Sequence, residues 1–265
     1  MSFFEYKNDD RVYLKSDALD FDSKVCHAFT TKLGGVSRGK IEGFNLGFRV
    51  NDDEESVREN YRLLASDLRV DLNRIVLSKQ SHTDNIRIVT EEDAGKGLTK
   101  LSDIEDTDAL ITNIRNIALV IFSADCVPIL MYDPKKEVVA AVHAGWRGSV
   151  SGIAPKCAEL MKSRFGSTAE DIRVAIGPSI GKCCFEFGEE AVTYFDEKYY
   201  KKEQSGKFKV DLWEYNKDLL INLGVKPENI DISGICTMCE SERFYSYRAH
   251  REKTGRLGAV IMLRG

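Results

Sequence analysis

Short apolar runs, separated by polar or glycine-containing stretches, recur along most of the chain. Two of them, at 117–122 and 138–142, are rich in β-branched residues and too short for a helix, so they predict buried strands. Similar runs predict further strands at 25–30, 75–77, 86–89, 109–112, 171–176 and 257–263. The pattern therefore indicates a protein with many short strands.

Helical spacing appears in other segments. Val57, Tyr61, Leu64 and Leu68 recur at intervals of three or four residues, and the acidic residues before them supply an N-cap, which predicts a helix starting at residue 52 or 53. Further helices are predicted at 149–165, 189–199 and 212–223. Strands and helices alternate irregularly, without a repeat or a linker. We therefore expect an α/β fold of mixed sheets with flanking helices, in a single compact domain spanning residues 1–265.

The two β-branched runs are connected by a segment that contains a turn signal at 133–136, with Pro134 suited to the second position of a type I turn. We interpret the runs as a hairpin. If its turn is centred between Pro134 and Lys135, Cys126 and His143 face each other. Directly opposed residues hold their Cβ atoms about 5 Å apart, close enough for a thiolate and an imidazole to bind one zinc-like ion.

A third ligand is sought among the four histidines of the chain. His82 lies in a polar break between two apolar segments, a position typical of a strand end or loop. With Cys126 and His143 it makes a set of two histidines and one cysteine. That set is typical of a catalytic zinc site whose fourth position is open to water or substrate, and copper is the alternative metal.

Composition excludes several classes of protein. Hydrophobic residues make up 43% and charged residues 30% of the 265 positions, as in ordinary soluble proteins. The net charge of -4 argues against a nucleic-acid partner, which requires a basic surface. We find no signal peptide, and no apolar run long enough for a membrane helix, so we expect a cytoplasmic protein without a membrane partner.

Seven cysteines are too few, and odd in number, for a disulfide framework. Cys236 and Cys239 have CxxC spacing, and together with Cys183 and Cys184 they could form a second zinc site. Adjacent cysteines are poor chelators of a single ion, however, and no flanking ligand pattern appears. We therefore favour packing as the role of these four residues.

Several phrases in the sequence resemble the laccase-domain family, formerly called polyphenol oxidase-like and now regarded as purine nucleoside phosphorylases. The order of ADCVP and HAGWRG is the most specific part of this resemblance, which covers nearly the whole chain. The phrases are GGVS at 34–37, NLG at 45–47, QSH at 80–82, ADCVP at 124–128, HAGWRG at 143–148, IGPSI at 176–180, FYSYR at 244–248 and TGR at 254–256.

The resemblance implies metal ligands at His82, Cys126 and His143, the same residues that the spacing argument selects. It also implies phosphorolysis of adenosine, inosine and S-methyl-5'-thioadenosine, with adenosine deamination as a side activity. The implied small-molecule partners are purine nucleosides and phosphate, and the implied cofactor is Zn²⁺, with Cu²⁺ as the alternative.

Four other residues are candidates for roles near the metal. Asn45 lies in a glycine-rich loop that could bring its amide to a substrate. Arg147 follows a tight glycine turn at the predicted start of a helix, which favours phosphate binding. Asp125 is a candidate for proton handling or for orienting a ligand, and Arg248 for contact with phosphate or nucleoside. The alternative for each charged residue is a structural ion pair.

Two other functions are weighed against nucleoside chemistry. A copper-dependent polyphenol oxidase is disfavoured because multicopper oxidation requires many more histidines than four. A metal-stabilised module without enzymatic activity is disfavoured because structural zinc is normally closed by four protein ligands.

Overall fold

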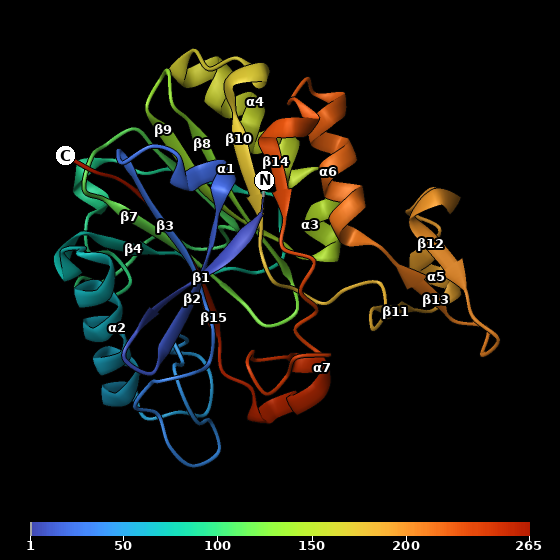
Figure 1. The fold of residues 1–265 in the computed structure, drawn as a ribbon, viewed down its shortest axis with the longest axis horizontal. Coiled ribbons are helices and arrows are strands. Elements are labelled where there is room, and N and C mark those ends of the chain that lie inside the picture. The colour runs from blue at the N-terminus through green and yellow to red at the C-terminus, as the bar shows by residue number, and fades with distance from the viewer. Residues whose placement is uncertain (1) are drawn as a thin grey trace.

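The computed structural model describes residues 2–265, which form two six-stranded sheets and one small sheet (Figure 1). The first sheet is ordered β1 (Phe3–Asn8), β2 (Arg11–Ser16), β3 (Val25–Thr30), β15 (Leu257–Leu263), β7 (Ala118–Ser123) and β4 (Ile75–Leu77). The second sheet is ordered β14 (Ile230–Ile232), β10 (Arg173–Ile176), β8 (Val127–Asp133), β9 (Val138–Ala144), β6 (Ala109–Thr112) and β5 (Ile86–Ile88).

Both large sheets are mixed. In the first sheet β4 pairs in parallel with β7, while β7, β15, β3, β2 and β1 pair antiparallel in succession. In the second sheet the outer pairs β5–β6 and β10–β14 are parallel and the inner pairs are antiparallel. The predicted α/β fold with mixed sheets is confirmed.

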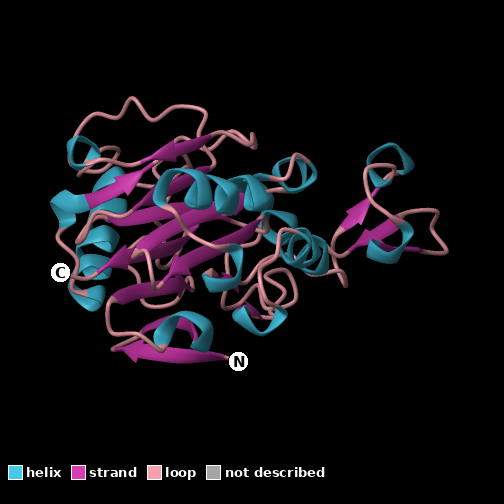
Figure 2. Cartoon of the chain, turned by 90° about the horizontal axis from the view of Figure 1, so that it is seen from above, coloured by secondary structure: helices cyan, strands magenta, loops and turns pink. Residues whose placement is uncertain are grey.

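The sheets face each other, and helices cover their outer surfaces (Figure 2). One apolar cluster fills the space between the sheets. A second cluster lies between the first sheet and α2 (Glu54–Leu68), and a third between the second sheet and the helices α4 (Ile153–Phe165) and α6 (Leu212–Asn222). The result is a four-layer arrangement of helix, sheet, sheet and helix.

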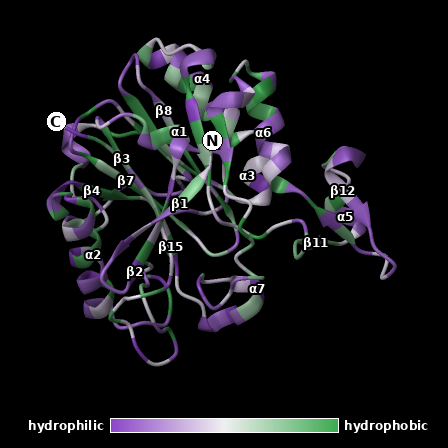
Figure 3. Ribbon diagram, in the orientation of Figure 1, coloured by the Kyte–Doolittle hydropathy of each residue, from purple (hydrophilic) through white to green (hydrophobic). Residues whose placement is uncertain are grey.

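This layering explains why the strands read as continuous apolar runs, which Figure 3 shows as hydrophobic strands in the interior. In β7, Leu119 and Ile121 point between the two sheets, while Ala118 and Val120 point toward α2. Residues that alternate between two buried faces must all be apolar. Such a run identifies a strand but does not indicate which sheet it joins.

The structure contains a hairpin at this position, but the prediction named the wrong first strand and the wrong pairing register. The partner of β9 is β8, whereas the run at 117–122 belongs to the first sheet. A four-residue loop at 134–137 joins β8 to β9. Asp133 pairs with Val138 at the end of the ladder, and its side chain accepts hydrogen bonds from the backbone amides of Lys135 and Lys136. This loop is longer than the expected two-residue turn. His143 therefore lies opposite Pro128, and Cys126 falls just outside the ladder.

The helix predictions have mixed outcomes. Helix α2 begins after Asp53, whose side chain accepts from the amide of Ser56 at 2.8 Å, as predicted. The segment predicted as one helix at 149–165 is two, α3 (Trp146–Val150) and α4, because Gly152 adopts a left-handed φ of 76° between them. Two further short helices are α1 (Asp17–Asp20) and α7 (Tyr247–His250).

The predicted helix at 189–199 is mostly absent: α5 (Glu189–Val192) ends after four residues. Phe195 and Tyr199 pack edge-on against Tyr215 of α6, each with ring centroids 5.0 Å apart, and this packing overrides helix continuation. The chain on both sides of this segment forms the small sheet of β11 (Glu186–Phe187), β13 (Phe208–Val210) and β12 (Tyr200–Lys202), which projects from the main body in Figure 1.

Within the described residues 2–265, we find no helix with the length and apolarity that crossing a membrane requires.

Candidate metal centre and substrate cavity

The three predicted metal ligands come together from separate connections of the fold. His82 lies between β4 and β5, Cys126 between β7 and β8, and His143 in β9. One ligand atom from each residue lies within 4.8 Å of the others. The Cys126 sulfur is 3.7 Å from His82 Nε2, and the two imidazole centroids are 5.0 Å apart. This donor set and spacing fit a single zinc-sized ion, although their role as ligands stays a prediction.

Two of these segments contain a residue with a strained backbone conformation. His82 has a φ of 66° and Asp125, which precedes Cys126, a φ of 87°. Both values lie in the left-handed region, which costs free energy for residues other than glycine. Such costs are found where a site requires a particular backbone direction. Cys126 directly precedes Val127, which pairs with Ala144, so Cys126 lies beside the end of β9.

Asp108 organises the site, and sequence reasoning missed it. Its Oδ1 lies 2.7 Å from Nδ1 of His143, and its carboxylate accepts hydrogen bonds from the amides of Ser81, His82 and Thr83 at 2.9 to 3.1 Å. With Nδ1–H donated to Asp108, Nε2 of His143 faces the other ligands. A carboxylate that orients a ligating histidine is a recurrent part of metal sites.

The charges of the site support one another. Burial raises the pKa of Asp108, but the hydrogen bond and charge of His143 and the amides of Thr83 and Ser81 outweigh it and lower the pKa to about 2. Burial also raises the pKa of the Cys126 thiol, and the His143 and His82 imidazoles more than compensate, lowering it to about 6. The cysteine is thus readily available as thiolate, the form that binds metal.

Gly145 closes the site from the side of α3. A Cβ atom at this position would lie 2.9 Å from His82 Cδ2 and 3.4 Å from the Cys126 sulfur. Any larger residue would displace the imidazole. The HAGWRG phrase therefore runs from the end of strand β9 through Gly145 into helix α3. This is the order of strand, glycine turn and helix that the sequence predicts.

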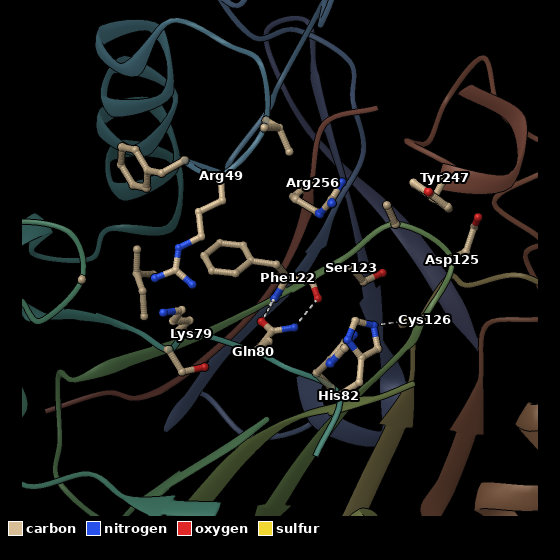
Figure 4. Close-up of a pocket in the computed structure, with 18 of the residues that line it drawn as sticks. Arg49, Lys79, Gln80, His82, Phe122, Ser123, Asp125, Cys126, Tyr247 and Arg256 are labelled. Carbon is tan, nitrogen blue, oxygen red and sulfur yellow. Dashed lines mark hydrogen bonds between the residues drawn. The ribbon is translucent and has the colours of Figure 1, made fainter. Parts of the chain in front are cut away.

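A cavity of about 680 Å³ opens beside the three residues. Figure 4 shows Arg49, Phe122 and Arg256 grouped on one side of it, with His82 and Cys126 on the other. The side-chain amide of Gln80 holds the backbone of Phe122 through two hydrogen bonds of 2.6 and 2.8 Å. Aromatic walls are supplied by Phe48, Phe122, Trp146, Phe185 and Tyr247.

Five arginines line this cavity: Arg49, Arg58, Arg147, Arg248 and Arg256. The structure thus brings the predicted Arg147 and Arg248 to the cavity that His82, Cys126 and His143 also line. Arg147 is exposed and stacks on Trp146, with its Cζ 4.4 Å from the ring centroid, and Arg248 donates to the Cys184 carbonyl at 3.3 Å.

Arg49, Arg58 and Arg256 received no role from the sequence. Arg256 was quoted within the TGR phrase, which was the available signal. Burial lowers the pKa of the Arg256 guanidinium. Among the described residues, Arg49 forms neither a hydrogen bond nor an ion pair. Arg62, by contrast, pairs with Glu55 and Glu59 on the exposed face of α2.

Asp125 faces inward from the cavity wall, with both carboxylate oxygens engaged. Oδ1 accepts from the Thr237 hydroxyl at 2.7 Å, and Oδ2 accepts from the Arg248 amide at 2.6 Å. These contacts tie the Cys126 loop to the C-terminal segment that carries Arg248. The geometry supports a positioning role more than proton transfer.

Asn45 is fully buried and lies behind the cavity wall. Its amide donates to Asp52 at 2.7 Å, and its carbonyl accepts from the amides of Gly47 and Arg256 at 2.9 and 2.8 Å. Direct substrate binding by Asn45 stays untested. The contacts favour a role in holding Arg256 and the segment that leads to Arg49.

Comparison with known proteins places the chain among relatives of the same fold. Residues 26–264 match the family described as multi-copper polyphenol oxidoreductase laccase. The chain is 34% identical over 247 residues to purine nucleoside phosphorylase YlmD of Bacillus subtilis, covering 91% of this chain and 89% of the relative. It is 35% identical over 254 residues to adenosine deaminase RL5 of an unknown prokaryotic organism, covering 92% and 97%.

A solved structure of YlmD from Geobacillus stearothermophilus superposes with a TM-score of 0.92 at 33% identity, covering 100% of both chains. The family match extends over most of the chain, and these relatives align along nearly their whole length. The chain therefore belongs to the multi-copper polyphenol oxidoreductase laccase family, several of whose members are named purine nucleoside phosphorylases.

Proposed function

We propose that this protein is a metal-dependent purine nucleoside phosphorylase acting on adenosine, inosine and S-methyl-5'-thioadenosine, with adenosine deamination as a side activity. The observation that carries the proposal is the convergence of His82, Cys126 and His143 at one end of a cavity lined by aromatic and arginine side chains. Relatives named purine nucleoside phosphorylase and adenosine deaminase support the same class of substrate.

His82, Cys126 and His143 would hold the metal, with Zn²⁺ favoured and Cu²⁺ as the alternative. When bound, the metal supplies Lewis acidity at an open coordination position. Asp108 fixes the tautomer and orientation of His143 through its contact with Nδ1. Asp125 holds the segments on which Cys126 and Arg248 stand.

Phosphorolysis requires a phosphate oxygen to form a bond to ribose C1′ while the bond from C1′ to the purine nitrogen breaks. The electron pair of the broken bond leaves with the base, which takes up a proton, and ribose 1-phosphate is the other product. Arg147 and Arg248 would hold the phosphate, because guanidinium groups bind its oxygens with charge-assisted hydrogen bonds. Arg49, free of partners within the described chain, is a third candidate.

The purine base would bind against the aromatic walls of the cavity. The backbone of Phe122 is held by Gln80, and Phe185 and Tyr247 lie on the side of the cavity near Arg248. Flat apolar rings favour stacking with a purine. The volume of about 680 Å³ lies in the range typical of small-molecule sites.

Adenosine deamination replaces the amino group at C6 with oxygen from water, releases ammonia and needs no phosphate. It would use the same metal ligands but not the arginines. This difference separates the two activities experimentally.

Polyphenol oxidation, which the family description carries, is the weaker proposal for this chain. The sequence contains four histidines, of which His82 and His143 face the predicted metal site. Multicopper oxidation requires several copper ions with many imidazole ligands. The donors present fit one ion at this position.

The test is chromatography of adenosine incubated with the purified protein, with and without phosphate, alongside metal analysis. The proposal expects adenine and ribose 1-phosphate only with phosphate, and inosine in both reactions. Absence of both base release and inosine, in protein carrying its metal, would contradict it.

A further inference from the structure

Four cysteines outside the proposed active site also converge. Cys183 and Cys184 lie between β10 and β11, and Cys236 and Cys239 lie between β14 and α7. Their four sulfur atoms lie within 4.8 Å of one another. The sulfurs of Cys183 and Cys184 are each 3.5 Å from that of Cys239. Cys183 and Cys184, which the sequence suggested were poor chelators of a single ion, thus both lie within reach of one shared position.

We propose that Cys183, Cys184, Cys236 and Cys239 bind a second metal ion, Zn²⁺, as a closed structural site. Four thiolates at a zinc–sulfur distance of about 2.3 Å around a tetrahedral ion lie about 3.8 Å from each other. The two separations of 3.5 Å, with all four sulfurs within 4.8 Å of one another, are close to this spacing. A set of four sulfur ligands selects zinc or an iron centre over harder cations.

Exposure argues against packing as the role of three of these four thiols. Cys183 and Cys239 are exposed, Cys184 is half-buried and Cys236 is buried, whereas Cys26 and Cys157 are both buried in apolar surroundings. A cysteine that serves packing is normally buried. The four converging sulfurs lie where an ion can reach them.

The backbone holds the two cysteine-bearing turns in place without the ion. Ser179 and Cys236 form a parallel bridge, in which Ser179 donates to the Ile235 carbonyl and accepts from the Thr237 amide at 3.1 Å. The Gly181 amide donates to the Cys236 sulfur at 3.3 Å. Amide hydrogen bonds of this kind stabilise a thiolate, the protonation state that a zinc site requires.

A disulfide explains the cluster less well. It would join two sulfurs about 2.05 Å apart and leave the other two without a role. Cys183 and Cys184 lie equally close to Cys239, so no single pair is singled out.

The second site would stiffen one wall of the substrate cavity. Phe185, which lines the cavity, directly follows Cys184, and the Cys184 carbonyl accepts from Arg248. Thr237, next to Cys236, donates to Asp125 beside the first site. An ion linking the two turns would therefore fix both the aromatic wall and Arg248. The inference does not depend on the nucleoside chemistry proposed above.

The decisive measurement is zinc content together with zinc X-ray absorption of the wild-type protein, purified under reducing conditions. Two filled sites give two zinc ions per chain and an average of about 2.5 sulfurs per zinc at about 2.3 Å, because one site has one thiolate and the other four. One zinc per chain with one sulfur would overturn the proposal. Iron bound in place of zinc would overturn the identity of the ion.

Cys239→Ser provides a second test. It should lose one zinc equivalent, keep the other and melt at a lower temperature, while the matched control Cys26→Ser keeps both ions. Two equivalents retained in folded Cys239→Ser would contradict the assignment. So would a disulfide among the four residues, detected by alkylation and mass analysis of freshly purified protein without the second zinc.

Discussion

Nδ1 of His143 lies 2.7 Å from Oδ1 of Asp108, and the same carboxylate accepts backbone hydrogen bonds from the loop that carries His82. Asp108 thus positions two of the three predicted metal ligands at once. Its removal should disturb the site more than the loss of one hydrogen bond.

We predict that Asp108→Asn weakens metal binding by about 10- to 100-fold, the usual effect of removing a carboxylate that orients a ligating histidine. Chelator competition measures the affinity. Asp106→Asn is the matched control, because the side chain of Asp106 is exposed and only its carbonyl is engaged. Equal affinities in the wild type and Asp108→Asn would remove Asp108 from the site.

Gly145→Ala should also lower metal affinity, without unfolding the protein. The added methyl would stand 2.9 Å from His82 Cδ2, so the imidazole must move, while the backbone of Gly145 has a φ of -61° that alanine adopts without strain. Metal affinity and circular dichroism of the variant measure the two effects. An unchanged affinity would show that the ring of His82 can shift without leaving the metal.

Arg147→Ala should reduce phosphorolysis selectively. Loss of a charge-assisted contact to phosphate costs roughly 2 kcal/mol, about 30-fold in rate. Deamination needs no phosphate and should fall much less. Quantifying adenine, hypoxanthine and inosine from adenosine in one reaction separates the two activities.

The control for Arg147→Ala is Arg62→Ala, since Arg62 lies on the solvent face of α2 in ion pairs with Glu55 and Glu59. It should leave both activities unchanged. Equal loss of both activities in Arg147→Ala would instead assign that residue to nucleoside binding or to the fold.

Asp93 should make stability depend on pH in the acid range. Burial raises its pKa, but the Lys96 ammonium, the Thr90 amide and the Arg87 guanidinium outweigh burial and lower it to about 2. The pKa in the unfolded chain is about 3.9. Because the folded value is the lower one, the carboxylate stabilises the protein above about pH 4, and this contribution is lost as the pH falls toward 2.

We therefore expect Asp93→Asn to lower the free energy of unfolding at pH 7 by about 1–2 kcal/mol, allowing for solvent screening at the half-exposed Arg87. The difference from wild type should shrink as the pH falls from 4 to 3. Urea unfolding at several pH values measures it, with the exposed neighbour Glu92→Gln as control. A difference that grows toward low pH would refute this account of Asp93.

The sequence predicted the members of the metal site better than their arrangement. With four histidines in the chain, His82 could be selected by its place in a polar break, and His143 and Cys126 by their places after buried apolar runs. The register on which their pairing rested was wrong, because the loop at 134–137 is longer than the expected turn. The ligands still meet because Val127, next to Cys126, pairs with Ala144, next to His143, so both residues stay beside the same end of the ladder.

Other features could not be predicted because they depend on contacts between distant segments. Asp108 lies 35 residues before His143 at the end of an acidic stretch, and its residue type does not distinguish it from the exposed Glu105 and Asp106. The run at 117–122 is buried on both faces, so its pattern could not say which sheet it joins. The four clustered cysteines meet only because β10 and β14 are adjacent parallel strands.

The central claim is that His82, Cys126 and His143 support phosphate-dependent cleavage of purine nucleosides. The most direct test is to incubate inosine with the wild type, Cys126→Ser and the control Cys26→Ser, with and without phosphate, and to quantify hypoxanthine and ribose 1-phosphate. We predict equal amounts of the two products from the wild type and Cys26→Ser, only with phosphate, and none from Cys126→Ser, which folds but lacks the metal at this site. Full product formation by metal-free Cys126→Ser, or hypoxanthine without ribose 1-phosphate in the wild type, would contradict the claim.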